Sequence, residues 1–212
     1  MKGLFIKDLY IIRQNLKSLL FILVVWGAVF LPRGGTFIIP MFTVVGGIYI
    51  LNLFSYDKQT QWDSFMLSMP VKRKAVALER YLFSAGMTLV SGVTAVIAVA
   101  AAQLLMHGAI SPDLISEIIY SWLSGIVASF FYMAIALPLT YWLGVEKARM
   151  VPAVLLGVLF LGFVMVGKNG GGEMALTEEW LSLMIGCCTA VSVLTMVISA
   201  FISVKIFEKK EF

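Results

Sequence analysis

The sequence carries little charge, and this scarcity excludes a soluble globular domain. Only 13% of its 212 residues are charged, whereas 60% are hydrophobic and the mean hydropathy is +0.96. Soluble domains carry about 25% charged residues. The apolar residues also gather in long runs, as expected of helices that cross a bilayer. The composition therefore predicts an integral membrane protein.

Residues for redox and metal chemistry are equally scarce. The two cysteines, Cys187 and Cys188, are adjacent in an apolar run, so they predict neither a disulfide framework nor a metal site. The only histidine, His107, has no second histidine with which to bind zinc or build a catalytic triad. The glycine-rich stretch 167–172 lacks the residue order of a phosphate-binding loop. We therefore expect no catalytic, cofactor-binding or metal site, which disfavours an intramembrane enzyme.

The long apolar runs predict an all-α integral membrane fold with six transmembrane helices. The expected spans are 18–31, 36–55, 81–106, 118–143, 150–166 and 181–207. The first is shorter than the roughly 20 residues that a bilayer requires. It ends without a small-x-small cleavage pattern, so we expect a retained span rather than a cleaved signal peptide.

Residues 1–17 predict an amphipathic helix that lies along the membrane surface. Leu4, Phe5, Leu9, Ile12 and Leu16 recur at helical spacing, whereas the basic residues fall mostly on other faces. We expect the first four of these apolar residues to anchor an interfacial helix. The alternative is a frayed polar N-terminus.

The basic residues lie almost entirely on one side of the predicted membrane. With the N-terminus inside, 14 of the 16 lysines and arginines are on the inner side, and only Arg33 and Lys168 are outside. This asymmetry follows the positive-inside rule. We therefore expect a multi-pass protein of the cell membrane with both termini in the cytoplasm.

The long polar interruption between the second and third spans, residues 56–80, is then also cytoplasmic. Trp62, Phe65, Met66 and Met69 form one stripe of a helix. Pro70 ends that helix, because its ring clashes with the preceding turn. Basic residues follow at 72–74 and lead into the third span. The pattern predicts a short amphipathic helix that docks on a soluble partner, then a break and a basic helix start.

No ionisable residue occurs between the interfacial ends of the expected spans, although ion-coupled carriers usually need one there. The polar residues inside the spans are serine, threonine, asparagine and glutamine. Together with Gly86, Gly92 and Gly125 they favour helix–helix packing and interhelical hydrogen bonds. A polar substrate site is the alternative. A transporter built this way must take its energy from a partner.

The polar segment also resembles a known family. Asp57, Trp62 and the run Leu67-Ser68-Met69-Pro70-Val71-Lys72-Arg73 are similar to the acidic…aromatic…Leu-Pro-Val-x-Arg run of type-2 ATP-binding-cassette (ABC) transporter permeases, with Met69 where leucine is commoner. The opening Met-Lys-Gly-Leu-Phe-Ile-Lys-Asp-Leu looks like the interfacial helix of that family. The resemblance implies that this segment is a coupling helix that docks on an ATPase. The residues implied in coupling are Asp57, Trp62, Asp63, Phe65, Met66, Pro70 and Arg73.

The resemblance further implies that residues 18–212 form the permease subunit of an ATP-driven exporter. Such a chain is no enzyme itself, because ATP and Mg²⁺ bind the separate ABC ATPase subunit. A second permease copy, identical or related, and membrane lipid are the other implied partners, and nucleic acid is not one. The implied cargo is apolar or amphipathic, as for exporters of bacteriocins and phenol-soluble modulin peptides. The alternative is a non-transporting scaffold or sensor subunit that recruits a cytosolic partner.

Overall fold

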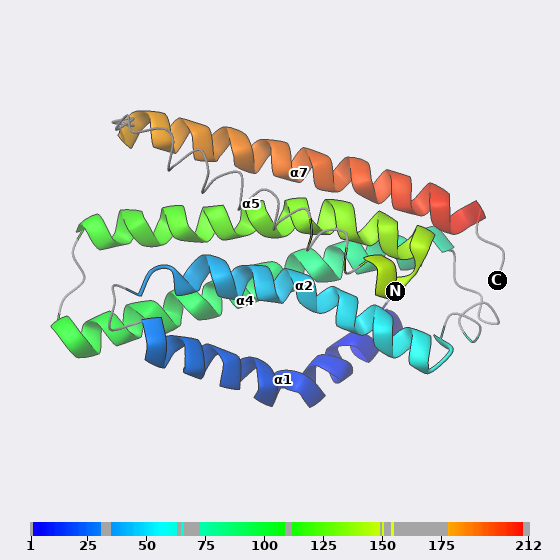
Figure 1. Ribbon diagram of the computed structural model, residues 1–212, viewed down its shortest axis with the longest axis horizontal. Coiled ribbons are helices and arrows are strands. Elements are labelled where there is room, and N and C mark those ends of the chain that lie inside the picture. Colours follow the sequence, from blue (N-terminus) through cyan, green and yellow to red (C-terminus); the bar gives the residue numbers. More distant parts are fainter. Residues whose placement is uncertain are drawn as a thin grey trace.

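The protein is a bundle of long helices laid side by side (Figure 1). The computed structural model describes residues 2–30, 35–62, 65, 73–108, 112–148, 150, 154 and 178–209, among which no strand occurs. The helices are α1 (Lys2–Phe30), α2 (Ile38–Gln59), α4 (Arg73–His107), α5 (Pro112–Leu143) and α7 (Glu178–Lys209). The predicted all-α fold is confirmed for these residues. The expected fifth span, 150–166, lies almost wholly outside them, so the count of six spans stays a prediction.

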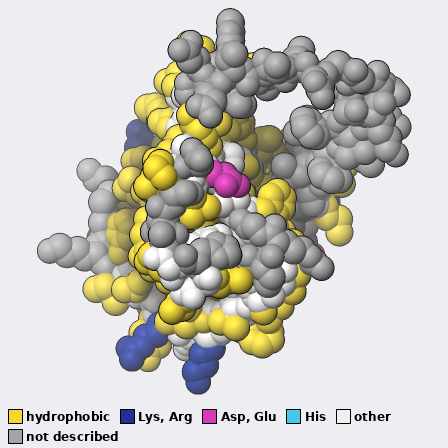
Figure 2. Space-filling view, turned by 90° about the vertical axis from the view of Figure 1, so that its left-hand side faces the viewer, with side chains coloured by type: hydrophobic (Ala, Val, Ile, Leu, Met, Phe, Trp, Pro, Cys, Tyr) yellow, Lys and Arg dark blue, Asp and Glu magenta, His cyan; other side chains and the backbone are white. Residues whose placement is uncertain are grey.

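Each of these five helices contains a stretch that is long and apolar enough to cross a membrane. Their outward faces are hydrophobic: Phe21, Leu105 and Phe201 are 69%, 88% and 68% exposed. Figure 2, which looks onto the end of the bundle where α1 finishes and α5 begins, shows hydrophobic side chains spread over the flanks. Lipid tails can cover such a surface without loss of hydrogen bonds, because the helices satisfy their own backbone groups.

Helices α2 and α5 form the centre of the bundle, and α1 and α7 lie at its edge. About half of the membrane-crossing stretch is buried in α2 (56%) and α5 (50%), against 6% in α1 and 17% in α7. Glycines allow the central helices to approach closely, because a Cβ on Gly125 of α5 would lie 2.8 Å from the Pro40 Cα of α2. Likewise, a Cβ on Gly92 of α4 would lie 2.2 Å from the Trp122 Nε1 of α5. The predicted packing role is thus confirmed at these two glycines.

The same interpretation is wrong at Gly86. A Cβ on this residue would meet nothing within 4 Å among the described atoms, because Gly86 lies on the exposed side of α4. Composition alone does not say which face of a helix a glycine occupies.

Small polar side chains join the helices as the sequence predicts. Thr88 and Ser129 share a hydrogen bond of 3.0 Å between α4 and α5. Tyr81 of α4 contacts both Ser199 and Ser203 of α7, at 2.7 Å each. Each of these hydroxyls is thereby satisfied inside an apolar bundle, where an unpaired one would be costly.

The N-terminal region differs from the prediction. Residues 2–30 form one continuous helix, bent near its middle (Figure 1), and not a surface helix followed by a separate span. Of the predicted apolar stripe, Ile12 is buried and Phe5 half-buried against the bundle, whereas Leu9 and Leu16 are exposed. The inward stripe instead includes Asp8, which is fully buried.

The turn after α5 also differs from the expected loop at 144–149. Gly144 ends the helix with a φ of +84°, a conformation that suits glycine because it has no Cβ. Residues 145–148 then form a further helical turn.

Candidate functional site

Five charged side chains meet at the end of the bundle where α2 finishes and α4 begins. They are Lys7 and Asp8 of α1, Asp57 of α2, and Glu79 and Arg80 of α4, and we call them the charged cluster. Four of the five are buried: Asp8 is 0%, Glu79 1%, Arg80 2% and Asp57 5% exposed. Charged side chains are almost never buried unless they are paired.

Arg80 is the centre of the charged cluster. Its Nη1 donates to the Asp8 Oδ2 at 2.5 Å, and its Nη2 donates to Asp57. The planar guanidinium can hold two carboxylates at once because its donors form a rigid fork. Arg80 therefore joins three helices, α1, α2 and α4, through one side chain.

Lys7 closes the charged cluster from the other side. Its Nζ donates to the Asp57 Oδ1 at 2.6 Å and lies 3.3 Å from the Asp8 Oδ1. Both aspartates thus contact two cations. Glu79 has no such pairing, because its Oε2 is 3.8 Å from the Arg80 Nε and neither oxygen accepts a hydrogen bond from a described residue. The cluster therefore contains three carboxylates against two cations.

Aromatic rings cover the charged cluster and connect it to the polar segment after α2. The Lys7 ammonium lies 4.4 Å from the centre of the Trp62 ring, and the Arg80 guanidinium lies 5.2 Å from that of Phe54. Cations at such distances are attracted to the ring face. Trp62 also packs against Phe65, with ring centres 5.5 Å apart. Part of the predicted docking stripe is therefore held against α1.

A second polar link at the same end lies on the surface. Lys58 of α2 donates to Glu146, in the turn after α5, at 2.9 Å. The hydrogen bond and the positive charge of Lys58 lower the pKa of the Glu146 carboxyl below its ordinary value. Because both side chains are exposed, solvent screens this pair.

The residues predicted to act in coupling fall into three groups. Trp62 is half-buried and Phe65 is exposed, whereas Asp57 is buried and its carboxylate faces Lys7 and Arg80. The Asp57 carboxylate thus faces Arg80 inside the bundle, and its role in coupling stays a prediction. Asp63, Met66, Pro70 and the side chain of Arg73 lie outside the described residues.

Of the predicted interfacial anchors, Ile12 and Phe5 face the bundle, Leu9 is 62% exposed, and the side chain of Leu4 lies outside the described residues. Contact of this face with lipid stays a prediction.

The sequence interpretation missed Lys7, Asp8, Glu79 and Arg80 as a site. The sequence does contain a signal for this site. Asp8 precedes the first apolar run, Asp57 follows the second and Arg80 precedes the third, and in an antiparallel bundle these three positions lie at the same end. The pairing depends on contacts 72 residues apart in the chain, between Asp8 and Arg80. Spacing within one helix cannot reveal such a contact.

The charged cluster connects α1, α2 and α4 through ion pairs. No group of three or more His, Cys, Asp or Glu side chains among the described residues is arranged to hold a metal ion. Ion pairs between Lys7, Asp8, Asp57 and Arg80 instead join α1, α2 and α4. Movement of the segment after Gln59 would therefore act on α1 and α4 through Asp57, Arg80 and the Trp62–Lys7 contact.

The apolar outer faces and the helices that are long and apolar enough to cross a membrane define a multi-pass membrane protein. The family model described as "ABC-2 family transporter protein" matches residues 3–208, so the chain belongs to this family. Members of the family are membrane subunits and normally work with an ABC ATPase partner. No curated protein and no solved structure matches the chain.

Proposed function

We propose that this chain is the permease subunit of an ATP-driven exporter in the cell membrane, with both termini in the cytoplasm. The observation that carries the proposal is that the polar segment 56–80 meets the charged cluster at both ends: Asp57 and Arg80 are members of the cluster, and Trp62 lies against Lys7. A partner that pulls on this segment would act directly on α1, α2 and α4. Packed helices with two alternative arrangements can transmit such a movement.

In this proposal the segment from Tyr56 to Arg80 is the coupling element, and Phe65 with the neighbouring stripe contacts the ATPase. Aromatic side chains are common hot spots at protein interfaces. ATP and Mg²⁺ bind the ATPase subunit. Two permease copies enclose the pathway about a two-fold axis, because one small bundle leaves α1 and α7 largely uncovered. The cargo is apolar or amphipathic, and peptides of the bacteriocin or phenol-soluble modulin kind are the first candidates.

The test is the substitution Trp62→Ala in the complex reconstituted with the ABC ATPase that co-purifies with the chain. Truncation of a hot-spot aromatic costs about 2 kcal/mol or more, so ATPase affinity should fall about 30-fold. Peptide-stimulated ATP hydrolysis and peptide movement should fall with it. ATPase binding, hydrolysis and transport of a panel of amphipathic peptides are the measurements.

Trp142→Ala is the matched control, because Trp142 is 71% exposed on α5 and is a tryptophan outside the charged cluster. It should leave ATPase binding unchanged. Full transport by the Trp62 variant would contradict the coupling role. ATPase binding without movement of any peptide would instead support a scaffold or sensor.

A further inference from the structure

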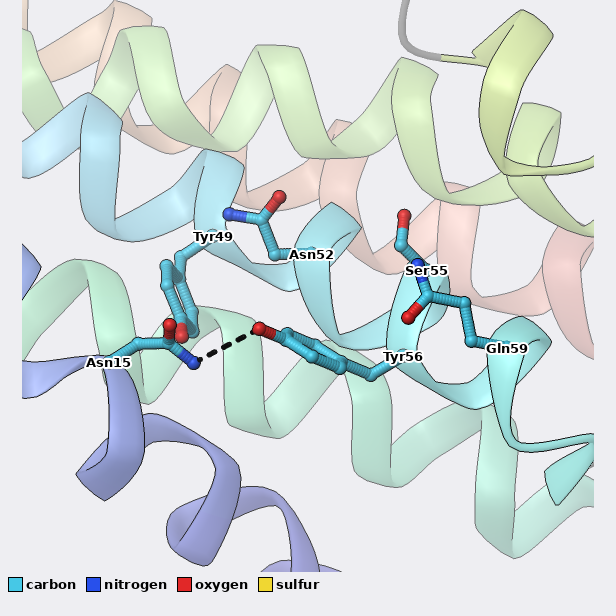
Figure 3. A pocket seen from close by; sticks show the side chains of 6 residues that line it. All are labelled: Asn15, Tyr49, Asn52, Ser55, Tyr56 and Gln59. Carbon is cyan, nitrogen blue, oxygen red and sulfur yellow. Dashed lines mark hydrogen bonds between the residues drawn. The ribbon is translucent and has the colours of Figure 1, made fainter.

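A polar cavity of about 360 Å³ opens between α1 and α2. Its lining consists of Asn15 of α1 and, on α2, Tyr49, Asn52, Ser55, Tyr56 and Gln59 (Figure 3). The cavity adjoins the charged cluster, since Tyr56 precedes Asp57 and Asn15 lies about two helical turns beyond Asp8. A cavity of this size can hold a small ligand or a few residues of a longer one.

The polar ends of Asn15, Tyr49 and Tyr56 converge in this cavity (Figure 3). Tyr49 is buried, with 7% of its surface exposed, and its hydroxyl has no hydrogen-bond partner among the described residues. The Asn15 Nδ2 donates to the Ile11 carbonyl at 3.1 Å and lies 3.5 Å from the Tyr56 hydroxyl. Because a buried hydroxyl is normally paired, Tyr49 marks a position where a bound molecule supplies the missing partner.

The lining selects the chemistry of that molecule. It has no charged side chain, so a charged ligand would find no counter-ion in the lining itself. A purely apolar ligand would leave the buried Tyr49 hydroxyl unsatisfied. An amide group fits both limits: it is neutral, and it offers one donor and one acceptor to Asn and Gln side chains, which offer the same pair.

We propose that this cavity binds an uncharged ligand through its amide groups, as a stretch of peptide main chain would present them. That the ligand is cargo rests on the proposed function. The cavity and the charged cluster share α1 and α2, so movement of these helices against each other would change both together. Ligand binding in the cavity would thereby be coupled to the position of the segment 56–80, on which the ATPase acts.

The experiment measures binding of two fluorescent probes to the full chain in lipid nanodiscs. One probe is dansyl-tetra-alanine amide, which is neutral and rich in main-chain amides. The other is dansyl-dodecylamide, which is apolar along its length. Maltose, a neutral hydroxyl-rich competitor, tests whether carbohydrate fits the same site. Tyr49→Phe removes only the unpartnered hydroxyl, and Tyr10→Phe removes a hydroxyl from the exposed side of α1 as the matched control.

We expect Tyr49→Phe to weaken binding of the tetra-alanine probe about three- to tenfold, as for the loss of one hydrogen bond. Binding of the dodecyl probe and the behaviour of Tyr10→Phe should not change. Equal effects on both probes, no saturable binding of the peptide probe, or displacement by maltose would overturn the proposal.

Energised transport separates this inference from the proposed function. With the ATPase present, peptide binding that depends on Tyr49 but gives no ATP-driven movement would support the cavity and contradict the exporter. ATP-driven peptide movement that is unaffected by Tyr49→Phe would support the exporter and contradict the cavity.

Discussion

At the scale of single residues, Arg80 is the side chain that connects the other members of the charged cluster. Arg80 is 2% exposed and holds two buried carboxylates, Asp8 and Asp57, from two other helices. The net value of a buried ion pair is small, because both charges lose their hydration. Removal of one partner is strongly destabilising, because the remaining charge stays buried without an opposite charge beside it. The charged cluster is therefore sensitive to partial removal.

We predict that Arg80→Ala lowers stability by about 3–5 kcal/mol, the cost of breaking a buried pair. The measurement is the apparent Tm of the purified protein in detergent. The triple variant Asp8→Leu/Asp57→Leu/Arg80→Leu removes Arg80 together with its two aspartate partners, leaves the opposite charges of Lys7 and Glu79, and should regain part of the lost stability. If the triple variant is as unstable as Arg80→Ala, the ion pairing is not the cause. We expect the triple variant to lose ATPase coupling all the same, because the link between α2 and α4 is gone.

Removal of one partner of the exposed pair Lys58–Glu146 should change the stability much less than removal of Arg80. Lys58 lowers the pKa of Glu146 from its ordinary value of 4.5. A carboxyl whose pKa is lowered by folding adds stability above its unfolded pKa, and this stability is lost as the pH falls through the folded value. We predict that Glu146→Gln changes the apparent Tm very little at pH 7, and that the remaining difference disappears below pH 4.5. A large loss at pH 7 that high salt does not reduce would contradict a screened surface pair.

At the scale of elements, the close approach of α2 and α5 depends on Gly125. A Cβ there would lie 2.8 Å from the Pro40 Cα and 2.9 Å from the Thr43 Cβ, so backbone atoms must move. We predict that Gly125→Ala costs about 1–3 kcal/mol, as overpacking does in well-packed interiors. The apparent Tm in detergent and the yield of folded protein are the measurements.

Gly86→Ala is the control within the same bundle, because a Cβ at Gly86 meets nothing within 4 Å. Alanine is the better helix former by up to about 1 kcal/mol, so this variant should be neutral or slightly more stable. Equal destabilisation by both substitutions would indicate a general intolerance of the helices and not close packing at Gly125.

The helices also show how far the sequence alone can be taken. Apolar runs predict α2, α4, α5 and α7 because membrane solvation is a property of each segment by itself. Residues 2–30 form one helix instead of two separate elements, whereas the location of residues 1–17 at the membrane surface stays a prediction. The burial of Asp8 depends on Arg80, which supplies a partner from another helix. The polar cavity was missed for the same reason, because Asn15 and Tyr49 meet only when α1 packs on α2.

At the scale of the whole molecule, the orientation in the membrane is a prediction from charge. In a variant with Cys187 and Cys188 replaced by serine, a cysteine at Lys74 should react with an impermeant maleimide only after the cells are permeabilised. A cysteine at Ile115, near the start of α5 at the opposite end of the bundle, should react in intact cells. Both positions are exposed in the structure. The reverse pattern would place the coupling segment outside and exclude a cytosolic ATPase.

The pairing of Asp8 with Arg80 also bears on how the protein is made. The two residues are 72 positions apart, so the ribosome completes α1 and α2 before the arginine exists. At about 5–20 residues per second, this delay lasts several seconds. During that time the aspartate has only its neighbour Lys7 as a counter-ion, 3.3 Å away in the finished protein. Helix α1 should therefore stay at the lipid–water boundary or beside the insertion machinery. It should reach its final position in the membrane only when α4 has been made.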